Sequence, residues 1–338
     1  MAGDNKVIPN FNLRLVGSIV GGLLIISLLI WSGSKLLLNL PAVTSEVTHT
    51  FQSNVTFTSI ASQPSKTDTP SPTRTSIPLT QTTIPPTSQL GIGSTMISEK
   101  DGMTLLYVPA GEFTMGSDNG ERDEKPVHTV DLDAFWIDQT EVTTAMYLDC
   151  VNDGECEEPA RTKYYSDSNH ASHPVVYVYW HDAFNYCSWA DRRLPTEAEW
   201  EKAASWNDST KEKFVYPWGN DFNCSKGNFS NRSYPNCNNF PITSPVGSFS
   251  TSTSPYGAFD MVGNVWEWVA DWYSETYYAS PSIPNPLGPD SGTYRVMRGG
   301  AYYSSLITPN YRSANRAGNF PSYADPLIGF RCAMSATP

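Results

Sequence analysis

Basic side chains are scarce in this sequence. It has 22 Lys and Arg against 34 Asp and Glu, which gives a formal net charge of −12 at pH 7. A nucleic-acid partner is excluded on this ground, because nucleic-acid phosphates require a cationic surface. Charged residues of both signs make up only 17% of the chain, which does not suit a long helical bundle. No repeat of fixed period is present, so a solenoid is also excluded.

Aromatic residues, in contrast, are plentiful, with 10 Trp and 18 Tyr. This composition is typical of a loop-rich fold whose core and clefts are built on aromatic rings. The 338 residues are enough for one large domain or two ordinary ones.

A long apolar run lies near the N-terminus, over residues 15–38, and Lys35 is its only charged residue. The run is long enough to cross a hydrocarbon layer of about 30 Å. A buried core helix is a poorer explanation, and so is a cleaved signal peptide, because no clear small-residue cleavage site follows. Lys6 and Arg14 precede the run, so we expect 1–14 to be cytoplasmic and the rest of the chain extracytoplasmic.

The next segment, 39–92, is rich in Ser, Thr and Pro. It has little apolar surface to bury, so we expect a disordered stalk between the membrane and a head. Asn54 begins an Asn-Val-Thr sequence that fits the N-glycosylation pattern, although many sequences fit it by chance.

The head, 93–338, changes pattern often. Alternating apolar runs predict strands at 104–108 and 135–137, and helical patterns cover 143–152 and 179–191. A third helix should begin at Thr196, because Glu199 follows this capping residue by three positions. From 216 onward Gly, Pro, Asn and Ser dominate, which predicts mostly coil. We therefore expect a mixed α+β head with little regular structure, braced by disulfides or metals.

A series of short motifs runs through the head, and Arg-Leu-Pro-Thr-Glu-Ala-Glu-Trp-Glu at 193–201 is the most diagnostic of them. The others lie at 108–117, 126–128, 138–143, 173–176, 180–183, 216–220, 245–247, 263–268, 298–300 and 329–332. In this order they resemble the formylglycine-generating (sulfatase-modifying factor) family. The resemblance covers nearly all of 104–333 and implies a single domain with a C-type-lectin-like fold.

The six cysteines bear on both structure and chemistry. An even number in an exported head suggests disulfides rather than metal thiolates or nucleophiles. The family resemblance implies a structural bridge between Cys187 and Cys332. The remaining cysteines would then form two local pairs, Cys150–Cys156 and Cys224–Cys237.

The resemblance also locates the family's copper site, which follows the Arg-Gly-Gly motif at 298–300. Active members carry a Ser and then two Cys there, whose thiolates bind Cu(I) for the oxidation of a substrate cysteine to formylglycine. This chain has Ala301 at the serine position, and Ser304 and Thr308 at the two cysteine positions. Because hydroxyls are poor ligands for a soft ion, we expect no copper centre and no copper-dependent oxidation.

The resemblance implies a binding cleft whose floor would here include Tyr302 and Tyr303, with Arg312 and Arg316 nearby. The two arginines could bind a peptide or an anionic ligand, or they could pair with nearby acids.

The family also holds calcium, an ion that takes six to eight oxygen ligands. By motif match, one site would use the side chains of Asp260 and Glu267 with the carbonyls of Gly263 and Val265. A second site would use Asn228 and Asn238 with the carbonyls of Phe229 and Phe240. Asn238 stands where the family usually has Asp, which should weaken the second site. The alternative is that these groups only accept hydrogen bonds within loops.

Other titratable residues carry weaker signals. The histidines of the head, among them His170 and His173, show no metal spacing, and a structural role is the better expectation for His173. Capping and pairing with arginine explain Glu197, Glu199 and Glu201 better than acid–base catalysis does.

Two functions remain open. The first is a membrane-anchored binding, sensor or accessory module with a protein or peptide ligand. The second is a formylglycine-generating oxidase that works without the cysteine pair. An iron oxidase is disfavoured, because no triad of two histidines and a carboxylate is evident.

Overall fold

The computed structural model describes residues 90–229, 237, 242–280, 283–303 and 311–336. The predicted transmembrane run 15–38 and nearly all of the predicted stalk lie outside these residues. Within the described part of the chain, no helix combines the length and apolar character needed to cross a membrane.

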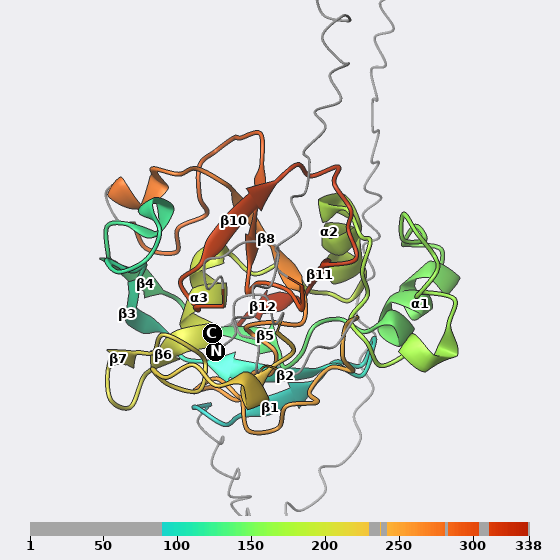
Figure 1. The fold of residues 1–338 in the computed structure, drawn as a ribbon, viewed down its shortest axis with the longest axis horizontal. Helices are drawn as coiled ribbons and strands as arrows, with labels where there is room; N and C mark the ends of the chain where they lie inside the picture. Colours follow the sequence, from blue (N-terminus) through green and yellow to red (C-terminus); the bar gives the residue numbers. More distant parts are fainter. Residues whose placement is uncertain (1–89, 230–236, 238–241, 281–282, 304–310, 337–338) are drawn as a thin grey trace, which may run out of the picture. The chain divides into compact units, whose positions relative to one another are not determined.

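Two four-stranded sheets and two short hairpins form the β structure (Figure 1). The first sheet has the order β1 (Thr95–Ile97), β2 (Thr104–Val108), β5 (Phe135–Asp138) and β12 (Ala333–Ser335), and all its pairs are antiparallel. Strand β12 pairs with β5, so the C-terminal strand lies in the same sheet as the first strands of the head. The predicted strands at 104–108 and 135–137 are thereby confirmed.

The second sheet has the order β10 (Arg316–Asn319), β9 (Arg295–Arg298), β8 (Trp266–Trp272) and β11 (Ile328–Phe330), in which only the β8–β11 pair is parallel. The hairpins join β3 (Gly111–Met115) to β4 (His128–Leu132) and β6 (Trp206–Asn207) to β7 (Glu212–Lys213). The prediction of mostly coil beyond 216 therefore missed the second sheet. Three of its strands have only three or four residues, and all four lie in a stretch rich in Gly, Asn and Pro, so the local pattern hides them.

Three α-helices begin where the sequence predicts. They are α1 (Thr144–Asn152), α2 (Trp180–Trp189) and α3 (Glu197–Ser205). The Thr143 hydroxyl accepts the Met146 N–H at the start of α1. Thr196 and Glu199 form a reciprocal capping box at the start of α3, which satisfies two backbone donors that a helix start otherwise leaves unpaired. Within the described residues, four 3-10 turns are also present, at Arg122–Glu124, Ser168–His170, Cys224–Lys226 and Tyr277–Ala279.

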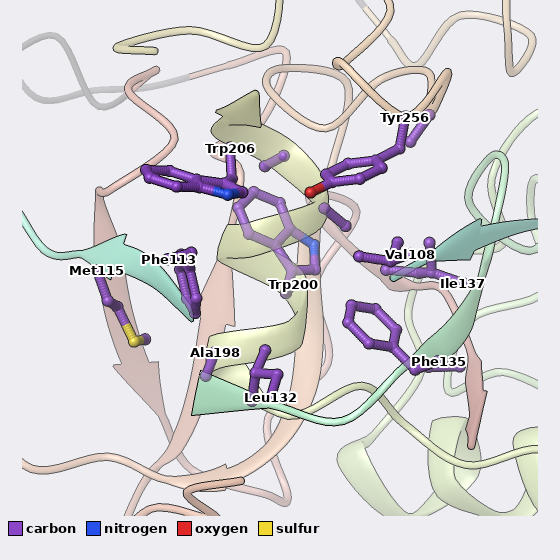
Figure 2. Close-up of a cluster of buried hydrophobic side chains, with 14 of the residues drawn as sticks. Val108, Phe113, Met115, Leu132, Phe135, Ile137, Ala198, Trp200, Trp206 and Tyr256 are labelled. Carbon is purple, nitrogen blue, oxygen red and sulfur yellow. The ribbon is translucent and has the colours of Figure 1, made fainter. Parts of the chain in front are cut away.

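Aromatic side chains fill the core, as the composition indicates. Helix α3 is buried along its whole length, and Figure 2 shows its Trp200 at the centre of a cluster with Trp206, Phe113 and Tyr256. A second cluster packs Tyr147 of α1 against helix α2 and the second sheet. The head is therefore a mixed α+β fold with few helices, and this fold carries the residues of the candidate site.

Candidate functional site

All six cysteines of the sequence are joined in disulfides. The pairs are Cys187–Cys332, Cys150–Cys156 and Cys224–Cys237, which confirms the three predicted bridges. Cys187 and Cys332 are fully buried between α2 and the C-terminal strands. No cysteine is left over, so the chain has no thiol with which to bind Cu(I).

The Arg-Gly-Gly motif leads into the position of the family's copper site through a backbone turn that requires glycine. Gly299 and Gly300 have φ values of 92° and 76°, and a Cβ on Gly299 would lie 3.1 Å from the Met261 carbonyl oxygen. Ala301 and Tyr302 are buried behind this turn, while Tyr303 is 45% exposed. Ser304 and Thr308 lie outside the described residues.

The two arginines of the predicted cleft are both paired with buried carboxylates. Arg312 makes a bidentate pair with Glu124, at 2.6 Å for each contact. Arg316 makes a bidentate pair with Glu197, with Nε–Oε1 2.8 Å and Nη2–Oε2 2.6 Å, and its side chain is only 1% exposed. Of the alternatives that the sequence leaves open, the structure shows pairing with acids.

The acidic residues of α3 serve the same kind of network. Glu197 and Glu201 form ion pairs with the fully buried Arg298, and Glu201 also forms an ion pair with Lys213. Glu199 caps the helix and forms a bidentate pair with Arg193. Each carboxylate thus has a basic partner, as the sequence indicates.

The predicted first calcium site lies at a turn in which Asp260, Gly263 and Asn264 all have positive φ. The Asp260 carboxylate accepts the Gly247 N–H at 2.6 Å. Both oxygens of Glu267 accept from Arg331, at 2.7 and 2.8 Å. These carboxylates therefore accept hydrogen bonds from protein groups, as the alternative to calcium binding expects.

A third carboxylate, Glu141, joins this turn and was missed by the sequence reasoning. Its Oε1 accepts the Asn264 amide at 2.9 Å, and its Oε2 is buried without a hydrogen-bond partner among the described residues. Burial, with Asp260 nearby, raises the pKa of Glu141 well above its usual range, and burial raises the pKa of Asp260 to about 6. The only sequence signal was the place of Glu141 within the motif at 138–143.

Of the predicted second calcium site, Asn228 and Phe229 are described, whereas Asn238 and Phe240 lie outside the described residues. Asn228 is fully buried; its Nδ2 donates to the Ile242 carbonyl, and its Oδ1 has no partner among the described residues. Across that same part of the chain, no three or more His, Cys, Asp or Glu side chains converge as a metal site. An orphaned Asn oxygen nevertheless fits a cation that also takes carbonyl ligands.

Four rings on the loop that leads into α2 form a cluster, which we call the ring wall: Tyr164, His170, His173 and Tyr177. The ring centroids of Tyr164 lie 5.0 Å from His170 and 6.4 Å from Tyr177, and those of His170 and His173 are 4.8 Å apart. Burial raises the pKa of Tyr302 to about 12, with Tyr164 and Tyr177 adding to the shift.

The backbone of the ring wall is unusual at Tyr177, whose φ is 62°. Bulky residues rarely adopt this conformation, and such strain is concentrated at functional sites. The sequence could not reveal the cluster, because its members follow no helical or strand period.

Comparison with known proteins agrees with this architecture. Residues 94–336 match the model of the sulfatase-modifying factor enzyme 1-like domain. The chain is similar to the formylglycine-generating enzyme of Streptomyces coelicolor, with 34% identity over 68% of this chain and 89% of that protein. It is also similar to the inactive C-alpha-formylglycine-generating enzyme 2 of Mus musculus, with 31% identity over 69% of this chain and 86% of the relative.

A third relative is the serine/threonine-protein kinase Pkn1 of Chlamydia trachomatis, with 38% identity over 68% of this chain. The match spans only 38% of that kinase, so most of its length has no counterpart here. Among solved structures, PvdO from Pseudomonas aeruginosa superimposes with a TM-score of 0.58 at 27% identity, covering 73% of this chain and all of PvdO.

Proposed function

Because the chain belongs to the family of sulfatase-modifying factor enzyme 1-like domains, we propose that its head is a ligand-binding module without copper-dependent oxidase activity. The observation that carries this proposal is the pairing of all six cysteines in disulfides. Copper does not fit the remaining donors, since Cu(I) requires soft sulfur ligands and Ala301, Ser304 and Thr308 supply none.

The binding surface in this proposal comprises the ring wall together with Tyr302 and Tyr303. Tyrosines supply large contact area with a polar tip, and they are enriched where proteins bind other proteins. Arg312 and Arg316 would support this surface through their buried pairs with Glu124 and Glu197 rather than touch the ligand. A protein or peptide ligand is the class that suits such a surface.

Membrane display belongs to the same proposal. The apolar run 15–38 would anchor the chain with 1–14 in the cytoplasm, and the stalk 39–92 would hold the head outside. Three disulfides support this placement, because they persist in oxidising compartments. Protease protection in intact vesicles tests it: the head should be digested from the outer face only.

Relatives support a non-oxidase role without proving it. The mouse relative named as inactive carries the same kind of domain over most of its length. The chlamydial kinase shares this domain over only 38% of its length, which suits a module that serves a larger protein.

The alternative function is formylglycine generation, and an activity assay separates the two. The full chain, loaded with Cu(I), would be incubated with a peptide containing Cys-x-Pro-x-Arg, with the Streptomyces coelicolor enzyme as the positive control. We expect no aldehyde above the level of a protein-free reaction. Conversion at a rate comparable to the control enzyme would overturn the proposal.

Calcium is the proposed structural ion. Its ligands would be Asp260 and Glu267 with the carbonyls of Gly263 and Val265 at one site, and Asn228, Asn238 and the carbonyls of Phe229 and Phe240 at the other. The orphaned oxygens of Asn228 and Glu141 support the presence of a cation near this turn. When bound, the ion would supply charge that neutralises buried carboxylates.

A calorimetric calcium titration tests this part of the proposal. We expect binding in the full chain and a weaker response in Asp260→Asn, with Asp290→Asn on an exposed loop as the matched control. An absence of heat up to millimolar calcium would contradict the proposed sites.

A further inference from the structure

Two histidines that the sequence leaves unassigned come together in the ring wall. His170 ends the 3-10 turn Ser168–His170, and His173 follows three residues later. Their ring centroids are 4.8 Å apart with an interplanar angle of 53°. Both side chains are partly buried, and that of His170 is 13% exposed.

Each imidazole is held by a hydrogen bond at the same nitrogen. His170 Nδ1 lies 3.0 Å from Asp167 Oδ2, and His173 Nδ1 lies 2.9 Å from Thr243 Oγ1. An ionised carboxylate can only accept, so neutral His170 carries its proton on Nδ1 and leaves a lone pair on Nε2. The Thr243 hydroxyl can accept in the same way. Neither Nε2 has a hydrogen-bond partner among the described residues.

This arrangement is the one that protein metal sites use to orient histidine ligands. A ligating imidazole typically binds the ion through one nitrogen while the other donates to a carboxylate, hydroxyl or carbonyl. With a Zn–N distance of about 2.0–2.1 Å, two imidazoles on one ion have ring centres roughly 5 Å apart. The observed separation of 4.8 Å matches that spacing.

The charges around the pair are mixed: Asp167 is the partner of His170, while Lys163 lies 5.0 Å from the centre of the Tyr164 ring and Arg161 lies 5.8 Å from that of Tyr177. Two imidazolium ions at this separation would repel each other, and burial, together with His170, lowers the pKa of His173. Asp167 supplies a negative charge directly behind His170. The carboxylate of Asp167 is held in place as well, because its Oδ1 accepts the Asn169 N–H at 3.0 Å.

We propose that His170 and His173 bind one divalent transition-metal ion of the zinc class through their Nε2 atoms, within the ring wall. No third His, Cys, Asp or Glu side chain joins them among the described residues, so water or a donor group of the ligand would complete the coordination. The site is therefore an open one, able to exchange a ligand. This metal site goes beyond the proposed binding role, because the two histidines would bind the ion whether or not a peptide or protein ligand is present.

Zinc titration of the full chain in detergent tests the proposal. Calcium at a millimolar concentration is present throughout, so that sites with oxygen ligands are already filled. We expect one zinc ion to bind, and we expect binding to be lost in His170→Ala and in His173→Ala. Asp167→Asn keeps both ligands but removes the orienting charge, so it should weaken zinc binding by about 10- to 100-fold. His181→Ala, an exposed histidine on α2, is the matched control and should bind as the unmodified chain does.

A second readout locates the ion and does not depend on the folding of the variants. Diethyl pyrocarbonate modifies free imidazole nitrogens, and mass spectrometry reports each histidine separately. Zinc should protect His170 and His173 while His181 continues to react. The proposal is overturned if the unmodified chain binds no zinc below the millimolar range, if zinc leaves His170 and His173 unprotected, or if the double alanine variant binds zinc unchanged.

Discussion

The three disulfides close loops of very different length, and this difference makes their energetic contributions predictable. The sequence separations are 145 for Cys187–Cys332, 13 for Cys224–Cys237 and 6 for Cys150–Cys156. A disulfide restricts the unfolded chain more when the loop is longer. We therefore consider replacing each pair with two alanines in a separate variant of the full chain.

The chain-entropy relation sets the expected magnitudes. For separations of 145, 13 and 6 it yields about 5, 3 and 2 kcal/mol of lost stability at 25 °C. Cys187, Cys332 and Cys150 are all fully buried in the same cluster, so both the long-bridge and the Cys150–Cys156 variants also lose packing, and the difference between them reports loop length. The long bridge should thus matter most by about 2 kcal/mol or more.

Urea unfolding followed by tryptophan fluorescence measures these losses. The slope of the transition must stay the same among the variants for the free energies to be compared. The Cys150–Cys156 variant is the internal control, because it removes the same atoms but opens only a short loop. The entropic reasoning would be refuted if the Cys187–Cys332 and Cys150–Cys156 variants lost equal stability, or if the Cys150–Cys156 variant lost more.

Two further predictions concern buried charges. Glu267→Gln leaves Arg331 buried without its bidentate carboxylate partner, so it should lower the free energy of unfolding by about 3–5 kcal/mol. Asp153→Asn is the control, because it breaks only the exposed pair with Lys100 and should cost less than about 1 kcal/mol. Similar losses in the two variants would contradict this account. Burial, with a neighbouring carboxylate, raises the pKa of Asp271 from 3.8 to about 8. The folded protein therefore retains a proton that the unfolded chain has lost, and stability falls as the pH rises from about 4 to 8. Asp271→Asn should raise the thermal midpoint at pH 8 more than at pH 5, and an equal shift at both would refute the assignment.

Much of the fold could be predicted because its signals are local. The caps at Thr143 and Thr196 act on backbone groups three residues away, so a short stretch of sequence contains both partners. Family motifs extended this reach to the Cys187–Cys332 bridge, although its ends are 145 residues apart. The second sheet was missed because its strands draw their stability from neighbours rather than from their own pattern.

The candidate site depended more heavily on tertiary structure. Sequence comparison located the Arg-Gly-Gly turn and the absence of cysteine at Ser304 and Thr308. It could not decide whether Arg312 and Arg316 were free to bind a ligand. Their partners, Glu124 and Glu197, lie 188 and 119 residues away, and only the folded chain brings these charges together.

The amino-acid sequence by itself thus determined the family, the helix starts, the cysteine pairs and the missing thiolates of the copper site. Each of these follows from residue identity at positions that neighbouring motifs fix. Tertiary structure alone decided which buried carboxylates each arginine meets and that His170 and His173 lie 4.8 Å apart. Loop residues without a helical or strand period acquire such neighbours only through packing, because nothing in their local pattern sets the direction of their side chains.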